Sequence, residues 1–281
     1  MLVLKRLMAF VAANMAVLAG GAALAQDGPL GQPHPWQLGL QQAATPVMDN
    51  IIWFHDFLLW IIAIISVFVF VLLMIVIVRF NARSNPVPSR TTHNTLIEVV
   101  WTVLPVLILV AIAVPSFRLL FLELDVPKAD LTVKATGKQW FWSYSYPDEK
   151  FEFDSLLVQD KDLKQGQPRL LTADNAMVVP VNKVVRVQTT GADVIHSWAV
   201  PSFGVKIDAI PGRLNETWFK AEHTGTYYGQ CSQLCGRDHA FMPIEVRVVT
   251  DQEYAAWLAD AKKKFASTDS GPTALASAEA R

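Results

Sequence analysis

The chain has 281 residues, of which 52% are hydrophobic and 17% are charged, and its mean hydropathy is +0.29. This composition is too apolar for an ordinary soluble protein and too polar for a transporter with many spans, so we expect a few membrane helices and one soluble domain. The formal net charge of −1 excludes the basic footprint of a nucleic-acid-binding protein.

The N-terminal segment has the pattern of a secretory signal. Residues 1–25 combine a positive start at Lys5 and Arg6, a short apolar run and a final Ala-Leu-Ala, which fits the small-x-small cleavage rule. We therefore predict a cleaved signal peptide, with an uncleaved anchor helix as the alternative. Residues 26–47 hold several Gly, Pro and Gln and little periodicity, which predicts an irregular exoplasmic arm.

Residues 48–122 predict a transmembrane helical hairpin. Two apolar stretches, at about residues 57–78 and 99–117, are long enough to cross a bilayer. Residues 79–95 between them carry three arginines and no acidic residue, so the positive-inside rule places this loop in the cytoplasm.

Three residues in or next to the second span need comment. Pro105 and Pro115 lie within it, so we expect a kink or an early unwinding of this helix. Glu98 lies at its cytoplasmic end, and the simplest interpretation is that its side chain faces water, because ionisable groups inside a membrane are rare.

From residue 123 the composition changes, and residues 123–250 predict an all-β domain large enough to bury its own core. Short β-branched runs separated by Gly, Pro and Asn turns favour a β-sandwich or barrel, and they cover residues 131–135, 177–181, 184–189 and 244–249. Residues 251–266 predict a C-terminal helix. Residues 267–281 are rich in Ala, Ser and Thr and are expected to be disordered.

One loop collects the ligand types that redox-active copper prefers. It reads Cys231-Ser-Gln-Leu-Cys235-Gly-Arg-Asp-His239-Ala-Phe-Met242 and contains the only two cysteines of the chain. Thiolate, imidazole and thioether suit copper, and His196 is the best candidate for a further ligand from elsewhere. A second thiolate would let two sulfurs bridge two copper ions. A disulfide or a structural zinc site are the alternatives, although neither explains the methionine.

At these residues the chain resembles subunit II of haem–copper cytochrome c oxidase, which carries a binuclear copper A centre. The family loop reads Cys-Ser-Glu-x-Cys-Gly-x-x-His-x-x-Met, and this chain departs from it only at Gln233. The resemblance extends over nearly the whole chain after the signal segment. It implies a two-helix transmembrane hairpin followed by an all-β, cupredoxin-like Greek-key barrel.

The resemblance implies a role for each residue of the copper site. Cys231 and Cys235 would supply bridging thiolates. One copper ion would take His196 and Met242, and the other would take His239 and the backbone carbonyl of Gln233. In the family a glutamate at the Gln233 position also binds a magnesium or manganese ion shared with the large subunit. A glutamine offers that ion only a neutral oxygen, which attracts a hard cation more weakly.

Three further roles follow from the resemblance. The segment that begins Gly137-Lys-Gln-Trp140 matches a family motif whose first tryptophan receives electrons from cytochrome c, whereas an aromatic core strand is the plain alternative. Glu98 matches a glutamate at the mouth of a proton pathway. Acidic side chains near Trp140 could steer a basic cytochrome c or could merely be solvated, and the candidates are Asp154, Asp174 and Asp193.

The sequence is therefore interpreted as the electron-entry subunit of a bacterial proton-pumping terminal oxidase. It would accept electrons from cytochrome c and pass them to haem in the large catalytic subunit, where oxygen is reduced to water. The expected partners are that subunit, other oxidase subunits, cytochrome c and membrane lipid. The expected location is the inner membrane, with two spans and the copper domain in the periplasm. A quinol oxidase subunit and a membrane-tethered copper carrier are the rival interpretations.

Overall fold

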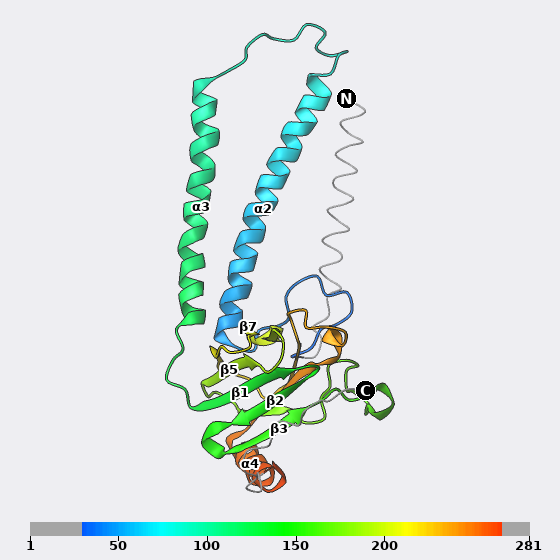
Figure 1. The fold of residues 1–281 in the computed structure, drawn as a ribbon. Coiled ribbons are helices and arrows are strands. Elements are labelled where there is room, and N and C mark those ends of the chain that lie inside the picture. The colour runs from blue at the N-terminus through cyan, green and yellow to red at the C-terminus, as the bar shows by residue number, and fades with distance from the viewer. Residues whose placement is uncertain (1–29, 266–281) are drawn as a thin grey trace. The chain divides into compact units, whose positions relative to one another are not determined.

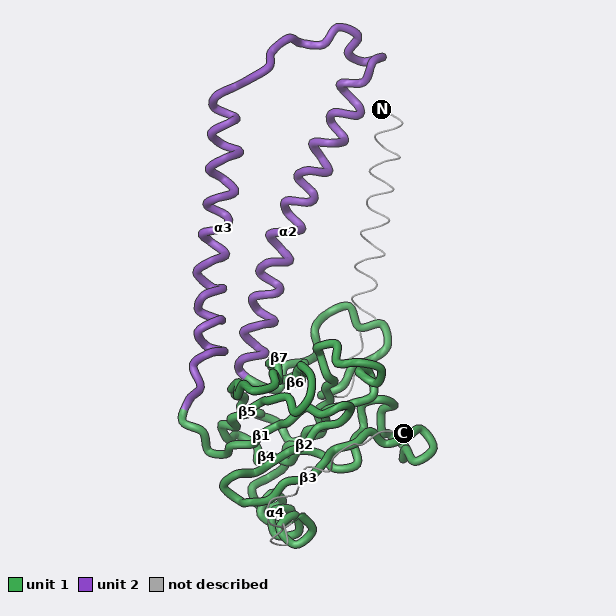
Figure 2. Tube along the Cα trace, in the orientation of Figure 1, with its two compact units in different colours: residues 1–45, 128–281 green, residues 46–127 purple. Residues whose placement is uncertain are grey.

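The computed structural model describes residues 30–265, so the expected signal peptide and C-terminal tail lie outside the described part of the chain. The chain divides into two compact units, which Figure 2 shows in different colours. One unit is the segment Pro46–Pro127. The other combines the residues up to Thr45 with those from Lys128 onward, so the chain leaves this second unit and returns to it.

The first unit is a helical hairpin, in which α2 (Pro46–Arg79) and α3 (Thr95–Leu124) run side by side (Figure 1). Both helices are long and apolar enough to cross a membrane. They extend beyond the predicted spans at both ends, with 34 residues in α2 and 30 in α3. At about 1.5 Å per residue a bilayer core needs about 20 residues, so each helix is longer than a crossing requires. The Asn94 side chain caps α3 by accepting the Ile97 N–H at 3.2 Å.

Helix α3 continues through Pro105 and Pro115 and ends only at Leu124, so it does not unwind early at either proline. Each proline removes one backbone donor, and most of the residues around it are apolar. In apolar surroundings an unpaired backbone group is costly, which favours helical hydrogen bonding on both sides of each proline.

The second unit is built mainly from β-strands, as predicted. The described strands are β1 (Leu131–Lys138), β2 (Phe141–Tyr146), β3 (Phe151–Ser155), β4 (Met177–Pro180), β5 (Val185–Gly191), β6 (His196–Val200), β7 (Val205–Ala209), β8 (Asn215–Phe219), β9 (Gly225–Gln230) and β10 (Pro243–Val249). They form three sheets, with the orders β3-β2-β1-β5-β8, β4-β10-β9 and β6-β7. The predicted C-terminal helix is α4 (Asp251–Phe265), which packs on β3 and β4.

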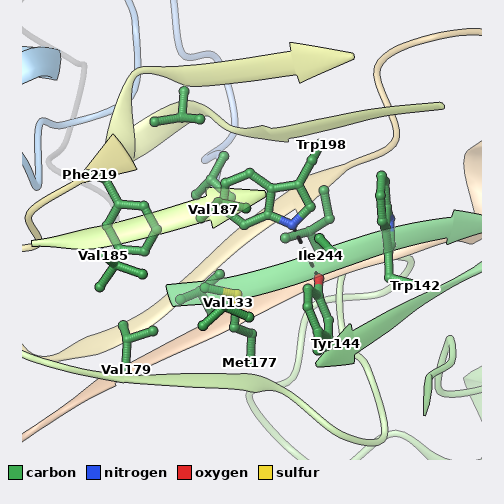
Figure 3. Packing of buried hydrophobic residues seen from close by; sticks show 14 of the residues in the cluster. Val133, Trp142, Tyr144, Met177, Val179, Val185, Val187, Trp198, Phe219 and Ile244 are labelled. Carbon is green, nitrogen blue, oxygen red and sulfur yellow. Dashed lines mark hydrogen bonds between the residues drawn. The ribbon is translucent and has the colours of Figure 1, made fainter. Parts of the chain in front are cut away.

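One hydrophobic core joins the three sheets (Figure 3). Strand β1 buries every second side chain, as a strand with one face on a core must. Val133 from β1, Met177 from β4 and Trp198 from β6 are fully buried in this core. The Trp198 indole N–H donates to the Tyr144 hydroxyl at 3.3 Å, which satisfies a polar group inside the apolar interior.

The described part of the predicted arm is irregular and is fastened to the β-domain. The Tyr228 N–H donates to the Gly31 carbonyl at 2.8 Å, and the Ala44 N–H donates to the Ser202 carbonyl at 2.9 Å. The Thr45 hydroxyl donates to the Phe203 carbonyl at 2.8 Å. Backbone bonds at both ends of residues 31–45 therefore make this segment part of the β-domain.

Glu245 on β10 is a buried carboxylate inside this domain. One of its oxygens accepts the Ala173 N–H at 2.8 Å. Burial raises the pKa of Glu245 and outweighs the opposing effects of that hydrogen bond and of Arg247. A carboxyl group whose pKa is higher in the folded than in the unfolded state favours folding at acid pH, and this contribution is lost as the pH rises through the folded-state pKa.

We expect Glu245→Gln to raise the melting temperature of the β-domain by a few degrees at about pH 7.5 and to leave it nearly unchanged at about pH 4. The amide keeps an oxygen for the Ala173 N–H and carries no charge. Thermal unfolding followed by tryptophan fluorescence measures the effect, with the exposed Glu222→Gln as the matched control. A lower melting temperature for Glu245→Gln at both pH values would contradict the argument.

Candidate metal centre

The predicted side-chain ligands converge in one cluster, in which all but the half-buried His239 are buried. The Cys231 and Cys235 sulfurs are 3.8 Å apart, and both cysteines are free. A disulfide would bring the sulfurs to about 2.05 Å. The Nδ1 atom of His196 lies 3.9 Å from the Cys231 sulfur, whereas the Cys235 sulfur lies 3.5 Å from His239 Nδ1 and 3.6 Å from Met242 Sδ. The ligand atoms of His196 and the two cysteines all lie within 4.8 Å of one another.

Gln233 contributes to this cluster with its backbone. The Cys231 sulfur lies 3.3 Å from the Gln233 carbonyl oxygen, while the Gln233 side chain is exposed. The carbonyl and the side chain of this residue therefore lie in different environments, and a change of side chain leaves the carbonyl in place.

The fold brings the loop and the distant histidine together. Strands β9 and β10 are antiparallel neighbours, with Gln230 opposite Pro243, so the loop of residues 231–242 leaves and returns at adjacent strand ends. The Ser232 N–H donates to the Ser197 carbonyl at 3.0 Å, which fastens the loop to β6. Because β6 begins at His196, this bond also places the imidazole beside the loop.

Asp193 fixes the orientation of the His196 ring. One oxygen of its carboxylate lies 2.9 Å from His196 Nε2, and the other accepts the Gln139 N–H at 2.7 Å. Burial would lower the pKa of His196, but hydrogen bonds with Cys231 and Asp193 raise it. Burial likewise opposes ionisation of Asp193, yet hydrogen bonds from His196, Val194 and Gln139 hold its pKa below the usual value. With Nε2 engaged in this way, Nδ1 is the nitrogen that faces the sulfurs.

Gly137 on β1 provides the space in which the His196 ring lies. A Cβ atom added at this glycine would be 2.7 Å from the Cδ2 and Cγ atoms of the imidazole. Any side chain here would have to displace the ring. This contact could not be predicted from the sequence, because it joins strands that are far apart in the chain.

The two thiols differ in acidity. Burial alone would raise the pKa of Cys231, but the hydrogen bond with His196 and neighbouring backbone groups lower it to about 6. Burial and the adjacent Cys231 sulfur raise the pKa of Cys235 to about 12. The pair therefore favours one thiolate and one thiol, and a cation that binds both sulfurs has to displace the second proton.

Trp140 is hydrogen-bonded to the backbone of this cluster. Its indole N–H donates to the Cys235 carbonyl at 3.2 Å, and the Gln139 side-chain amide donates to the same oxygen at 2.9 Å. The indole is half-buried and borders a hollow of about 310 Å³. The other residues that line the hollow are Leu156, Leu157, Gln159, Asp238 and Phe241.

The remaining predicted residues lie outside the cluster. Asp174 accepts the N–H of Leu156, a residue that lines the hollow beside Trp140, at 2.7 Å. Asp154 accepts a hydrogen bond from Ser143 and lies 3.6 Å from the Lys138 ammonium. Glu98 belongs to the hairpin, where its carboxylate accepts the Asn94 N–H at 3.3 Å in the first turn of α3.

The donor set fits copper. Two sulfurs that can ionise, two imidazoles and a thioether are soft or intermediate ligands, which copper binds well and which hard cations do not favour. Structural zinc sites are built from Cys and His, so the buried thioether of Met242 beside the Cys235 sulfur argues for copper over zinc.

Comparison with known proteins identifies the family. Residues 131–249 match the family described as cytochrome c oxidase subunit II, periplasmic domain, and residues 33–119 match its transmembrane domain. A probable cytochrome c oxidase subunit 2 of Rickettsia bellii is 52% identical over 86% of this chain and 91% of its own length. Cytochrome c oxidase subunit 2 of Cereibacter sphaeroides is 48% identical over 88% of each chain.

Among solved structures, the periplasmic domain of subunit II of cytochrome oxidase of Bradyrhizobium japonicum is 73% identical. The match covers 50% of this chain and 99% of the solved chain, with a TM-score of 0.48.

The family matches cover both the helical hairpin and the β-domain, and they confirm the predicted combination of two apolar helices with a cupredoxin-like domain. The His–Cys–Cys cluster is consistent with the copper A site. The chain thus belongs to the cytochrome c oxidase subunit II family, as the electron-entry subunit of a terminal oxidase.

Proposed function

We propose that this chain takes electrons from cytochrome c through Trp140 and delivers them to haem in the large catalytic subunit of a proton-pumping oxidase. The observation that carries the proposal is the hydrogen bond from the half-buried Trp140 indole to the Cys235 carbonyl. It connects a side chain at the domain surface with the backbone of a buried sulfur ligand. When bound, a binuclear copper centre supplies a one-electron carrier whose charge is shared between two ions.

The cluster geometry supports a definite ligand set. Cys231 and Cys235 would bridge the two ions, because their sulfurs are adjacent and unbonded. His196 Nδ1 and Met242 Sδ would complete one site. His239 Nδ1 and the carbonyl oxygen of Gln233 would complete the other.

The hard-cation site predicted at Gln233 has weaker support. The side chain is exposed and offers a neutral amide oxygen, whereas magnesium and manganese favour anionic oxygens. A shared ion at this position would depend mainly on oxygen ligands from the large subunit.

Burial of the cluster argues against a copper carrier. His196 and Met242 are 0% and 1% exposed, and the two cysteines are 5% and 4% exposed. A carrier has to release its ion to a partner, which requires ligands that the partner can reach. The complete set of sulfur and imidazole donors likewise argues against a quinol oxidase subunit.

The acidic residues near Trp140 have unequal support as docking groups. Asp174 has an exposed carboxylate bonded to the rim of the hollow, which suits a basic cytochrome c. The Asp154 charge is partly balanced by Lys138. Asp193 bonds His196, so we assign it chiefly to the orientation of that ligand.

The two apolar helices support a membrane location, with the β-domain in the periplasm. The loop between α2 and α3 contains Arg83 and Arg90, so we assign it to the cytoplasm of a bacterial cell with the helices in the inner membrane. Both ends of the hairpin then lie on the periplasmic side.

We expect Gly137→Ala to weaken copper binding at least about 10-fold, because the added methyl group displaces the His196 ring from its position. Copper per purified complex and the copper absorption spectrum measure the loss. Gly39→Ala is the matched control, since a Cβ at Gly39 meets no atom within 4 Å. Normal copper content in Gly137→Ala would remove His196 from the ligand set.

We expect Trp140→Phe to slow electron transfer from cytochrome c at least about tenfold, which corresponds to about 1.4 kcal/mol in activation free energy. The phenyl ring retains the aromatic surface but cannot donate to the Cys235 carbonyl. Stopped-flow oxidation of reduced cytochrome c measures the rate, and the copper spectrum shows whether the site is intact. Trp257→Phe, in the aromatic cluster under α4, is the control. Wild-type rates in Trp140→Phe with an intact copper spectrum would refute this point of electron entry.

For Glu98 we propose a role at the mouth of a proton pathway, and the capping contact with Asn94 is the competing explanation. Glu98→Gln separates the two, because a glutamine retains an oxygen for the Asn94 N–H but does not exchange a proton. We expect oxidase turnover and proton uptake to fall in both Glu98→Gln and Glu98→Ala. The decrease should lie between several-fold and about 10²-fold. Normal turnover and proton uptake in Glu98→Gln would leave only the capping role.

A further inference from the structure

An ion pair lies against the indole of Trp140. The Arg237 guanidinium is 5.3 Å from the centroid of the Trp140 ring. The same guanidinium donates to both carboxylate oxygens of Asp238, with an Nη2–Oδ2 distance of 2.8 Å and an Nε–Oδ1 distance of 3.1 Å. The Arg237 side chain is 81% exposed and that of Asp238 only 34%. The positive member is therefore the outer one.

Arg237 is not needed to hold the indole in place. Trp140 is already held by its bond to the Cys235 carbonyl and by close packing on Gly236, where a Cβ would lie 3.0 Å from the indole Cζ2. A cation–π contact at an exposed site adds little to those constraints. The main effect of Arg237 is thus its charge at the point where a donor protein has to make contact.

We propose that Arg237 and Asp238 act as a charge filter at the electron-entry surface and determine which donor surfaces can bind there. The proposal rests on the assignment of Trp140 as the point of electron entry. The filter favours a donor protein with an uncharged surface at its contact with the Trp140 indole. Basic side chains of the donor should lie only around this contact.

The physical basis is the range of the two charges. The charges of Arg237 and Asp238 sum to zero. Beyond a screening length of about 8 Å the pair therefore adds nothing to the electrostatic attraction of a donor protein. At contact, a donor lysine placed over Trp140 meets the exposed guanidinium and is repelled. A donor lysine placed over the hollow beside the indole meets the Asp238 carboxylate, which lines that hollow, and is attracted. The pair therefore selects both the charge pattern and the orientation of the donor.

The test uses the intact oxidase complex and a lysine-rich mitochondrial cytochrome c at low ionic strength. One unit charge about 6 Å from another in a water-like medium corresponds to about a threefold change in binding. We therefore expect Arg237→Gln to lower the KM for the cytochrome about threefold and Asp238→Asn to raise it about threefold. The double variant should lie between the two single variants. The effects should fall on KM and not on kcat, and they should shrink at high salt.

Three controls make the result specific. Lys263→Gln and Asp260→Asn alter a similar exposed ion pair on α4, and they should not shift KM in opposite directions. The same cytochrome with acetylated lysines should respond to neither Arg237→Gln nor Asp238→Asn. The copper spectrum reports whether the loop is intact. The Asp238 side chain makes no capping hydrogen bond to the short helix that follows it, so Asp238→Asn removes no such contact.

Two outcomes would overturn the charge filter. An unchanged KM in both single variants, while Trp140→Phe still slows electron transfer, would refute the filter and leave the proposed function standing. A lower kcat with an unchanged KM in Arg237→Gln would show that the arginine positions the indole instead. Failure of the proposed function has a different signature, namely normal electron transfer in Trp140→Phe.

Discussion

Two sulfur atoms held 3.8 Å apart without a bond between them are the constraint on which the metal centre depends. Each thiol is buried, where an isolated polar group is costly and a charged one more so. The surrounding groups offset this cost, since His196, His239 and the Gln233 carbonyl all lie within hydrogen-bonding reach of the sulfurs. The same groups that stabilise the buried thiols are those that a metal ion would use.

The strands around the cluster are spaced to keep this arrangement. The loop is short, and its two ends are fixed by the pairing of β9 with β10. Strand β6 can approach β9 closely because Gly229 has no side chain, and a Cβ there would overlap the Ala199 carbonyl. Gly137 makes room for the imidazole in a similar way. Two glycines on different strands thus set the distance between the loop and the histidine that joins it.

Much of this architecture could be predicted from local patterns. The two apolar stretches and the β-branched runs each predicted their element, because helix and strand have distinct periods and lengths that a short window of sequence reveals. The loop from Cys231 to Met242 was recognisable for the same reason, since its donor residues are close together in the chain. What the sequence could not supply was the set of contacts between distant segments.

Those contacts account for what the structure adds to the predictions. Asp193 was predicted as a docking charge, which stays a prediction, and its hydrogen bond to a buried imidazole could not be predicted because it depends on the turn before β6. No role could be predicted for Arg237, because its position over the Trp140 indole follows only from the folded loop. The two residues are almost a hundred positions apart in the chain. Helix α3 continues past Pro115, which the intrinsic preference of proline alone does not predict.

The fastening of residues 31–45 to the β-domain has a consequence for how the protein is made. The helical hairpin is an insertion in that domain, because segments on both sides of it contribute to one fold. During synthesis, residues 31–45 are made before the two membrane helices, and the strands of the β-domain are made after them. The domain therefore reaches its final form only when both flanks have arrived in the same compartment. Insertion of only one of the two helices would separate the flanks and leave the domain without the segment of residues 31–45.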